Sequence, residues 1–109
     1  MEKIIFIGGR GSGKTYLTEA IISQNRGVVL HPHTKKQYIN KAVAFCERIA
    51  FDGFYEHTLI KKILSEDKVC NLTHVLCTFQ EKPDWLTPMF AKKYRIKVFD
   101  LCRLPYISR

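Results

Sequence analysis

The sequence lacks a long hydrophobic run, a cysteine framework and an excess of acidic residues. No apolar run approaches the roughly 20 residues that a membrane-spanning helix needs. No signal peptide follows Met1 either, so we expect no membrane contact and a cytoplasmic location. The four cysteines have the spacing of neither a C-x-x-C redox pair nor a zinc site, and the sequence therefore predicts buried free thiols.

The composition is that of a small basic globular protein. The 109 residues are 46% hydrophobic, which predicts one domain over residues 1–109 with a single core. Lys and Arg number 18 against 10 Asp and Glu, a net charge of +8, and residues 82–109 hold seven of the basic residues against two acidic ones. Such a segment attracts nucleic-acid phosphates, although a solvated basic face that only aids solubility is the alternative.

The most specific segment is a glycine-rich loop between an apolar β-branched run and a helix-compatible stretch at 16–24. It fits the pattern G-x-x-x-x-G-K-[ST] and consists of Gly8, Gly9, Arg10, Gly11, Ser12, Gly13, Lys14 and Thr15. Glycines let successive N–H groups converge on one anion, and the start of the following helix adds positive potential. Lys14 would reach the β- and γ-phosphates, and the Thr15 hydroxyl would ligate Mg²⁺. The loop predicts binding of a nucleotide with Mg²⁺, the alternative being a glycine-rich turn without a ligand.

Apolar strands alternate with amphipathic helices along the chain, which predicts an α/β fold. The expected strands cover 3–7, 27–30, 48–52, 73–79 and 95–99. Helices are expected at 16–24, after Thr34 and Gln37 in capping-box spacing, at 58–66, and from Thr87-Pro88 to about Tyr94. We expect a three-layer P-loop core: a mainly parallel five-stranded sheet with helices on both faces.

Two of these strands end in an aspartate, Asp52 on the third and Asp100 on the fifth. Either carboxylate could hold Mg²⁺ through a water molecule in a phosphate-loop site. A turn role for Asp52 before Gly53 is the alternative for that residue.

These motifs together resemble the FtsK–HerA type of ATPase, especially the small genome-packaging ATPases of viruses and phages. The loop Gly8 to Thr15 matches the Walker A motif, residues 49–52 resemble the Walker B strand, and residues 76–80 resemble the following strand with its terminal glutamine. The resemblance implies that the third strand lies beside the fourth and the fourth beside the first. It implies Asp52 as the Mg²⁺ carboxylate and Gln80 as the residue that positions or senses the attacking water. It also implies ATP and Mg²⁺ as cofactors and a ring-shaped homo-oligomer in the cytoplasm of a host cell.

The chain departs from that family at the catalytic glutamate. Gly53 follows Asp52 where the family has a glutamate, and Glu56 is the nearest candidate to activate water. No arginine matches an arginine finger by its local pattern, which leaves Arg48, Arg95 and Arg103 as candidates. Slow or partner-dependent ATP hydrolysis is the expectation that follows.

The sequence therefore predicts an ATPase for DNA packaging or translocation. Duplex DNA would contact basic residues of the C-terminal segment, namely Lys92, Lys93, Arg95 and Lys97. A small-molecule kinase of the nucleotide type is an alternative, although no arginine for a phosphate-covering lid occurs between Asp52 and Phe79. A non-catalytic nucleotide-binding module that docks on a replication or packaging protein is the other alternative.

Overall fold

Strands and helices alternate along the chain in the computed structural model, which describes residues 1–9, 13–22 and 27–101. The strands are β1 (Glu2–Ile7), β2 (Gly27–Leu30), β3 (Arg48–Asp52), β4 (His74–Phe79) and β5 (Ile96–Asp100). The helices are α1 (Lys14–Ile22), α2 (Lys36–Phe45), α3 (Thr58–Leu64) and α4 (Pro88–Lys93).

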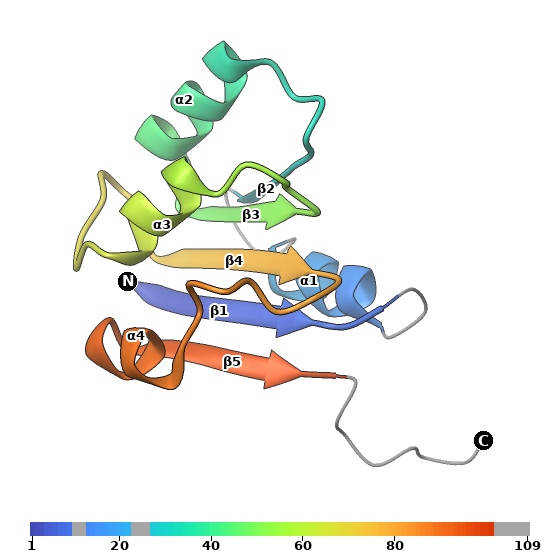
Figure 1. Ribbon diagram of the computed structural model, residues 1–109. Helices are drawn as coiled ribbons and strands as arrows, with labels where there is room; N and C mark the ends of the chain where they lie inside the picture. Colours follow the sequence, from blue (N-terminus) through green and yellow to red (C-terminus); the bar gives the residue numbers. More distant parts are fainter. Residues whose placement is uncertain (10–12, 23–26, 102–109) are drawn as a thin grey trace.

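The five strands form one parallel sheet in the order β2-β3-β4-β1-β5 (Figure 1). The expected neighbours are confirmed, because β4 lies between β3 and β1. Because all strands run the same way, their carboxyl ends share one edge of the sheet, here called the carboxyl edge. The opposite edge, where the strands begin, is called the amino edge.

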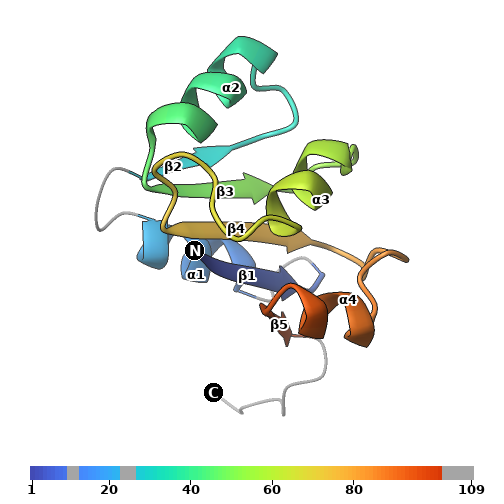
Figure 2. The same ribbon diagram turned by 90° about the vertical axis from the view of Figure 1, so that its left-hand side faces the viewer.

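Helices cover both faces of the sheet, as the alternating pattern predicts (Figure 2). Ile22 of α1 packs against one face together with Phe6, Ala50 and Leu76. Residues of α2 and α3 pack against the other face, which holds the larger core, and α4 contributes half-buried side chains to it. The three central strands, β3, β4 and β1, are buried on both faces of the sheet. Their sequences are therefore nearly continuous apolar runs and do not alternate between apolar and polar residues.

Two local predictions differ from the structure at helix starts. Helix α1 begins at Lys14 rather than at residue 16, because the last residues of the glycine loop already form its first turn. The capping box is wrong: the Thr34 hydroxyl accepts from the His31 amide at 3.0 Å, and α2 begins after Lys35 without a side-chain cap. At α4 the prediction is confirmed, since the Thr87 hydroxyl accepts from Phe90 N at 3.1 Å, with Pro88 next in the chain.

The described cysteines are free but differ in burial. Cys77 is buried in β4, Cys46 is half-buried and Cys70 is exposed, so the expectation of buried thiols holds for Cys77 and is wrong for Cys70. Cys102 lies outside the described residues. Burial raises the pKa of the Cys77 thiol, which suppresses its reactive thiolate form.

We expect a thiol-selective reagent at neutral pH to modify Cys70 quickly and Cys77 only after unfolding. Peptide mapping by mass spectrometry after timed labelling with iodoacetamide measures both residues in one sample. Labelling of Cys77 as fast as that of Cys70 in the native protein would contradict the burial of β4.

Candidate nucleotide-binding site

The loops that follow β1, β3 and β4 meet at the carboxyl edge. Gly8 N, at the end of β1, donates to Phe79 O of β4 at 3.0 Å, and Gly53 N donates to Thr78 O at 3.3 Å. The start of the glycine loop and the turn after Asp52 are therefore both hydrogen-bonded to the end of the same strand. Functional side chains from three separate parts of the sequence come together here, as they do in α/β proteins generally.

The glycine loop leads from a central strand directly into a helix, as its motif predicts. Gly13 has φ +92°, a conformation that L side chains rarely adopt, and its carbonyl accepts the Leu17 amide at 3.0 Å as α1 begins. The Lys14 amine reaches back across the loop and donates to Gly9 O at 3.1 Å. Arg10, Gly11 and Ser12 lie outside the described residues, as does the side chain of Thr15.

Asp52 ends β3 with one carboxylate oxygen held in place. The Thr78 hydroxyl, fully buried on β4, donates to Asp52 Oδ1 at 2.5 Å and accepts from Gly53 N at 3.2 Å. The other oxygen, Oδ2, lies 3.7 Å from His31 Nδ1. The Asp52 side chain keeps 26% of its surface exposed, so its charge remains accessible from the carboxyl edge.

Sequence reasoning missed Thr78 and His31, although strand register could have found both. Asp52 pairs with Thr78 across β3 and β4, and Leu30 pairs with Phe51 across β2 and β3. The residue after Leu30 therefore lies beside Asp52. Once the third strand is placed between the second and the fourth, counting residues to the strand ends puts His31 and Thr78 on either side of this carboxylate.

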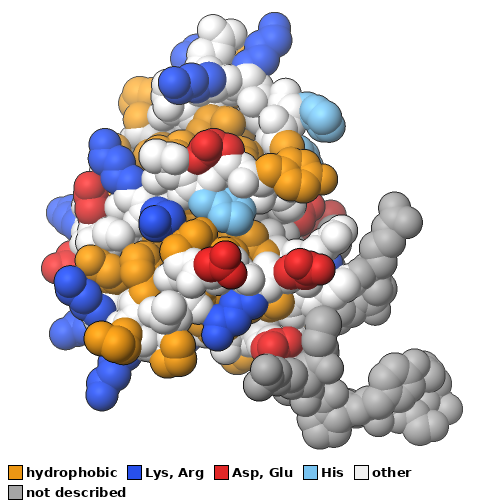
Figure 3. Space-filling view, viewed as in Figure 1, with side chains coloured by type: hydrophobic (Ala, Val, Ile, Leu, Met, Phe, Trp, Pro, Cys, Tyr) orange, Lys and Arg blue, Asp and Glu red, His pale blue; other side chains and the backbone are white. Residues whose placement is uncertain are grey.

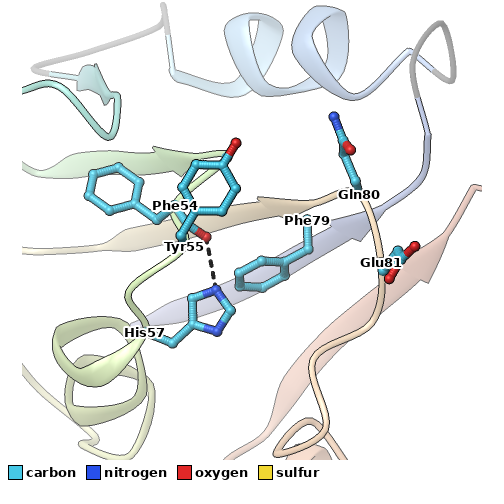
Figure 4. Close-up of a pocket in the computed structure, with 7 residues that line it drawn as sticks. Phe54, Tyr55, His57, Phe79, Gln80 and Glu81 are labelled. Atoms are coloured by element: carbon cyan, nitrogen blue, oxygen red, sulfur yellow. Dashed lines mark hydrogen bonds between the residues drawn. The ribbon is translucent and has the colours of Figure 1, made fainter.

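Gln80 follows β4 and is exposed at the same edge. Figure 4 shows its side chain directed toward the side of the sheet where α1 lies, away from the Phe79 ring. A hollow of about 350 Å³ opens beside it, between the turn after β3 and the end of β4. The lining residues are Gly53, Phe54, Tyr55, His57, Phe79, Gln80 and Glu81.

His57 supports this hollow and has both ring nitrogens engaged. The Trp85 indole N–H donates to His57 Nδ1 at 3.0 Å, and His57 Nε2 lies 2.8 Å from Phe54 O (Figure 4). Because an indole only donates, Nδ1 accepts, and Nε2 carries the proton that it gives to the carbonyl. His57 is thus a structural residue that orients the wall of the hollow.

Glu56, the candidate to activate water, has a structural partner instead. Its carboxylate accepts from Thr58 N at 2.5 Å, at the start of α3. Hydrogen bonding by Thr58 holds the pKa of the Glu56 carboxyl below its usual range. The geometry favours a capping role for this side chain.

Asp100 ends β5 at the same edge but on the far side of β1, where it pairs with Ile7. Three strand spacings separate β3 from β5, about 14 Å at the usual ~4.8 Å per strand. The two acidic candidates therefore flank the glycine loop from opposite sides. Asp52 is the one whose carboxylate Thr78 orients.

Two candidate arginines and the four basic residues expected to contact DNA, namely Lys92, Lys93, Arg95 and Lys97, lie outside this site. Arg48 donates to Ile21 O at 2.9 Å, which ties β3 to α1. Lys92 and Lys93 end α4, and Arg95 occupies the turn into β5. Lys97 of β5 forms an ion pair with Glu2 at 3.2 Å. The end of α4 and the start of β5, which carry Lys92, Lys93, Arg95 and Lys97, lie at the amino edge, opposite the glycine loop (Figure 1). Arg103 lies outside the described residues.

The donor set around the loop suits a nucleotide-bound Mg²⁺ rather than a metal held by protein side chains alone. Within residues 1–9, 13–22 and 27–101, no group of three or more His, Cys, Asp or Glu side chains could hold a metal ion. A phosphate-loop Mg²⁺ needs only a hydroxyl and one carboxylate from the protein, because nucleotide phosphates and water supply the other oxygens. Asp52 offers the carboxylate at the carboxyl edge, and Thr15 of the sequence motif would offer the hydroxyl, so this donor set is compatible with a nucleotide-bound Mg²⁺.

Comparison with known proteins adds no family assignment. No protein-family model matches the chain, and no curated protein and no solved structure is significantly similar to it. None of the helices in the described part of the chain is both long and apolar enough to span a bilayer.

Proposed function

We propose that the protein binds ATP–Mg²⁺ at the glycine loop and hydrolyses it to drive packaging or translocation of duplex DNA. One observation carries the proposal: the Walker A loop leaves a central strand directly into α1, and Asp52 and Gln80 follow the two neighbouring strands at the same edge. The adjacency of β3 to β4 and of β4 to β1 is the one that the resemblance to FtsK–HerA ATPases implies. We place this activity in the cytoplasm.

Each residue has a separate task in the proposed reaction, which is attack of water on the γ-phosphate. Lys14 would exchange its contact with Gly9 O for phosphate oxygens and stabilise the charge that spreads over them. Asp52 would hold the Mg²⁺ that neutralises charge on the β- and γ-phosphates, with Thr78 fixing the carboxylate. Gln80, exposed beside the hollow, would orient the attacking water.

The site lacks a carboxylate directly after Asp52, and Glu56 is engaged at α3. Complete catalysis would then depend on a further group, such as an arginine from a neighbouring subunit in a ring-shaped homo-oligomer.

The lack of a carboxylate directly after Asp52 also favours a second candidate function, a nucleotide-binding module that docks on another protein without turnover.

Phosphate release from γ-labelled ATP separates these functions. The purified protein is assayed with Mg²⁺ alone, with duplex DNA, and with nucleosides as small acceptors. We expect release that duplex DNA stimulates. Transfer of label to a nucleoside would indicate a kinase rather than a motor, and the hollow beside Gln80 could then be its acceptor site. ATP binding without release under any of the three conditions would favour the docking module.

A further inference from the structure

A second polar hollow lies at the amino edge, far from the glycine loop. It has a volume of about 530 Å³ and is lined by Met1, Lys3, Asp67, Lys93, Tyr94 and Arg95. Helix α4 ends at Lys93, and the chain enters β5 through Arg95, which has the left-handed φ of +57°. This tight turn brings the end of α4 against the start of β1.

Lys3 is a buried lysine at a position where the strand pattern calls for an apolar residue. It precedes Ile5 and Ile7 on the same face of β1, and only 4% of its surface is exposed. Its amine donates to Tyr94 O at 3.0 Å, a carbonyl that takes one of its three N–H donors. Burial lowers the pKa of Lys3, so the charged amine lacks part of the stabilisation that water would give it.

Two lysines approach the same aromatic ring in this hollow. Lys3 Nζ lies 5.8 Å from the centre of the Tyr94 ring, and Lys93 Nζ lies 5.3 Å from it. Arg95 is the next residue, and its charge also lowers the pKa of Lys3. The carboxylate of Asp67 lines the same hollow and raises the pKa of Lys3 more than Arg95 lowers it. An anion in the hollow would supply further acceptors to the Lys3 amine, which uses one donor on Tyr94 O, and would neutralise the charges of Lys93 and Arg95.

Figure 3 shows that Lys and Arg side chains are prominent along the left-hand margin of the molecule, over the amino edge. Lys92, exposed at the end of α4 next to Lys93, adds a further positive charge beside the hollow. A polyanion with successive phosphate groups fits such a surface better than an isolated carboxylate does, because each of the neighbouring cations can then contact a phosphate. The volume also exceeds the roughly 300 Å³ at the lower end of small-ligand sites.

We propose that this hollow binds a phosphate group of the nucleic-acid backbone, with Lys3, Lys93 and Arg95 as its ligands. The proposal rests on the nucleic-acid partner in the proposed function, but it does not require ATP at the glycine loop. Free phosphate shares the same chemistry, so the test has one arm for each source.

The first arm measures the affinity for a fluorescent DNA duplex by anisotropy over a range of salt concentrations, without ATP or Mg²⁺. Arg95→Gly is the central variant, because glycine favours the left-handed turn and the fold is retained while the charge is lost. Lys3→Met removes the buried amine and keeps an apolar side chain of similar length. Lys36→Ala, which removes one exposed charge from α2, is the matched control.

We expect Arg95→Gly and Lys3→Met each to weaken duplex binding and to lower the slope of log K against log salt by about 1, the value for one lost phosphate contact. Lys36→Ala should keep the wild-type slope. The second arm adds inorganic phosphate to ¹⁵N-labelled protein, and the Lys3 and Arg95 side-chain signals should shift together.

Equal affinities and slopes for Arg95→Gly, Lys3→Met and Lys36→Ala would overturn the nucleic-acid assignment. Shifts with inorganic phosphate but no duplex binding would do the same and leave a site for a free phosphate ion. Absence of both effects would overturn the phosphate site altogether. Because no nucleotide is present, none of these results depends on whether the protein hydrolyses ATP.

Discussion

Replacing Lys14 with alanine is expected to weaken ATP binding roughly 10- to 150-fold. Hydrogen bonds to charged groups contribute about 1.5–3 kcal/mol, and each ~1.4 kcal/mol is a factor of ten in affinity. Among the described residues, Lys14 donates to Gly9 O, a neutral contact whose loss costs the folded protein little. Phosphate release should fall further, because charge on the γ-phosphate oxygens grows in the transition state.

Isothermal titration calorimetry with ATP–Mg²⁺ measures this loss, and thermal unfolding followed by circular dichroism checks that the fold persists. Lys62→Ala is the matched control, since Lys62 is an exposed lysine on α3, away from the glycine loop. Wild-type affinity in Lys14→Ala would refute the phosphate-loop assignment. Loss of affinity in both variants would indicate a nonspecific charge effect instead.

Elements with sharp turn residues at their ends could be predicted well from sequence. Strands β2 and β3 have the expected bounds, because Gly27 begins β2 and Gly53 follows β3. Strand β3 sits beside β4, and β4 beside β1, as the resemblance implies. The start of α2 could not be predicted, because the Thr34 hydroxyl has two possible amide partners and bonds to His31 rather than to the helix.

Contacts between distant segments account for the features that the sequence could not reveal. Nothing local distinguishes Thr78 from other strand residues, and its role beside Asp52 depends on the register of β3 and β4. Lys3 likewise looks like an exposed residue near the chain start, and its burial depends on contacts with distant segments such as the turn through Tyr94 and Arg95. Glu56 could be placed near Asp52 by sequence distance, but its bond to Thr58 depends on where α3 begins.

Strand β1 links the two candidate phosphate sites. Its second residue, Lys3, faces the hollow at the amino edge, and Gly8 follows its carboxyl end. At about 3.3 Å per residue the two ends lie roughly 17 Å apart along a strand in the middle of the sheet. Nucleotide and nucleic acid would therefore bind opposite edges of the sheet at the same time without competing for space.

Replacing Asp52 with asparagine is expected to lower Mg²⁺-dependent phosphate release roughly 100- to 1,000-fold, the loss typical of one preorganised electrostatic group. Asparagine has the same shape, and its amide oxygen can still accept from the Thr78 hydroxyl, so the change removes charge without removing that hydrogen bond. Affinity for ATP without Mg²⁺ should stay near the wild-type value or rise, because a negative charge beside the phosphates is gone.

Asp100→Asn is the matched control, since it makes the same chemical change at the end of β5. Measuring the ATP affinity with and without Mg²⁺ identifies the carboxylate that binds the metal, because only replacement of that carboxylate should abolish the gain in ATP affinity that Mg²⁺ provides. If Asp100→Asn abolishes that gain and Asp52→Asn does not, the strand that supplies the metal carboxylate is β5, and the resemblance fails at its second motif.

Thr78→Val adds a finer test, because it removes the hydroxyl that orients the carboxylate of Asp52. The gain in ATP affinity from Mg²⁺ should become smaller without disappearing, since the charge of Asp52 remains while its orientation is lost.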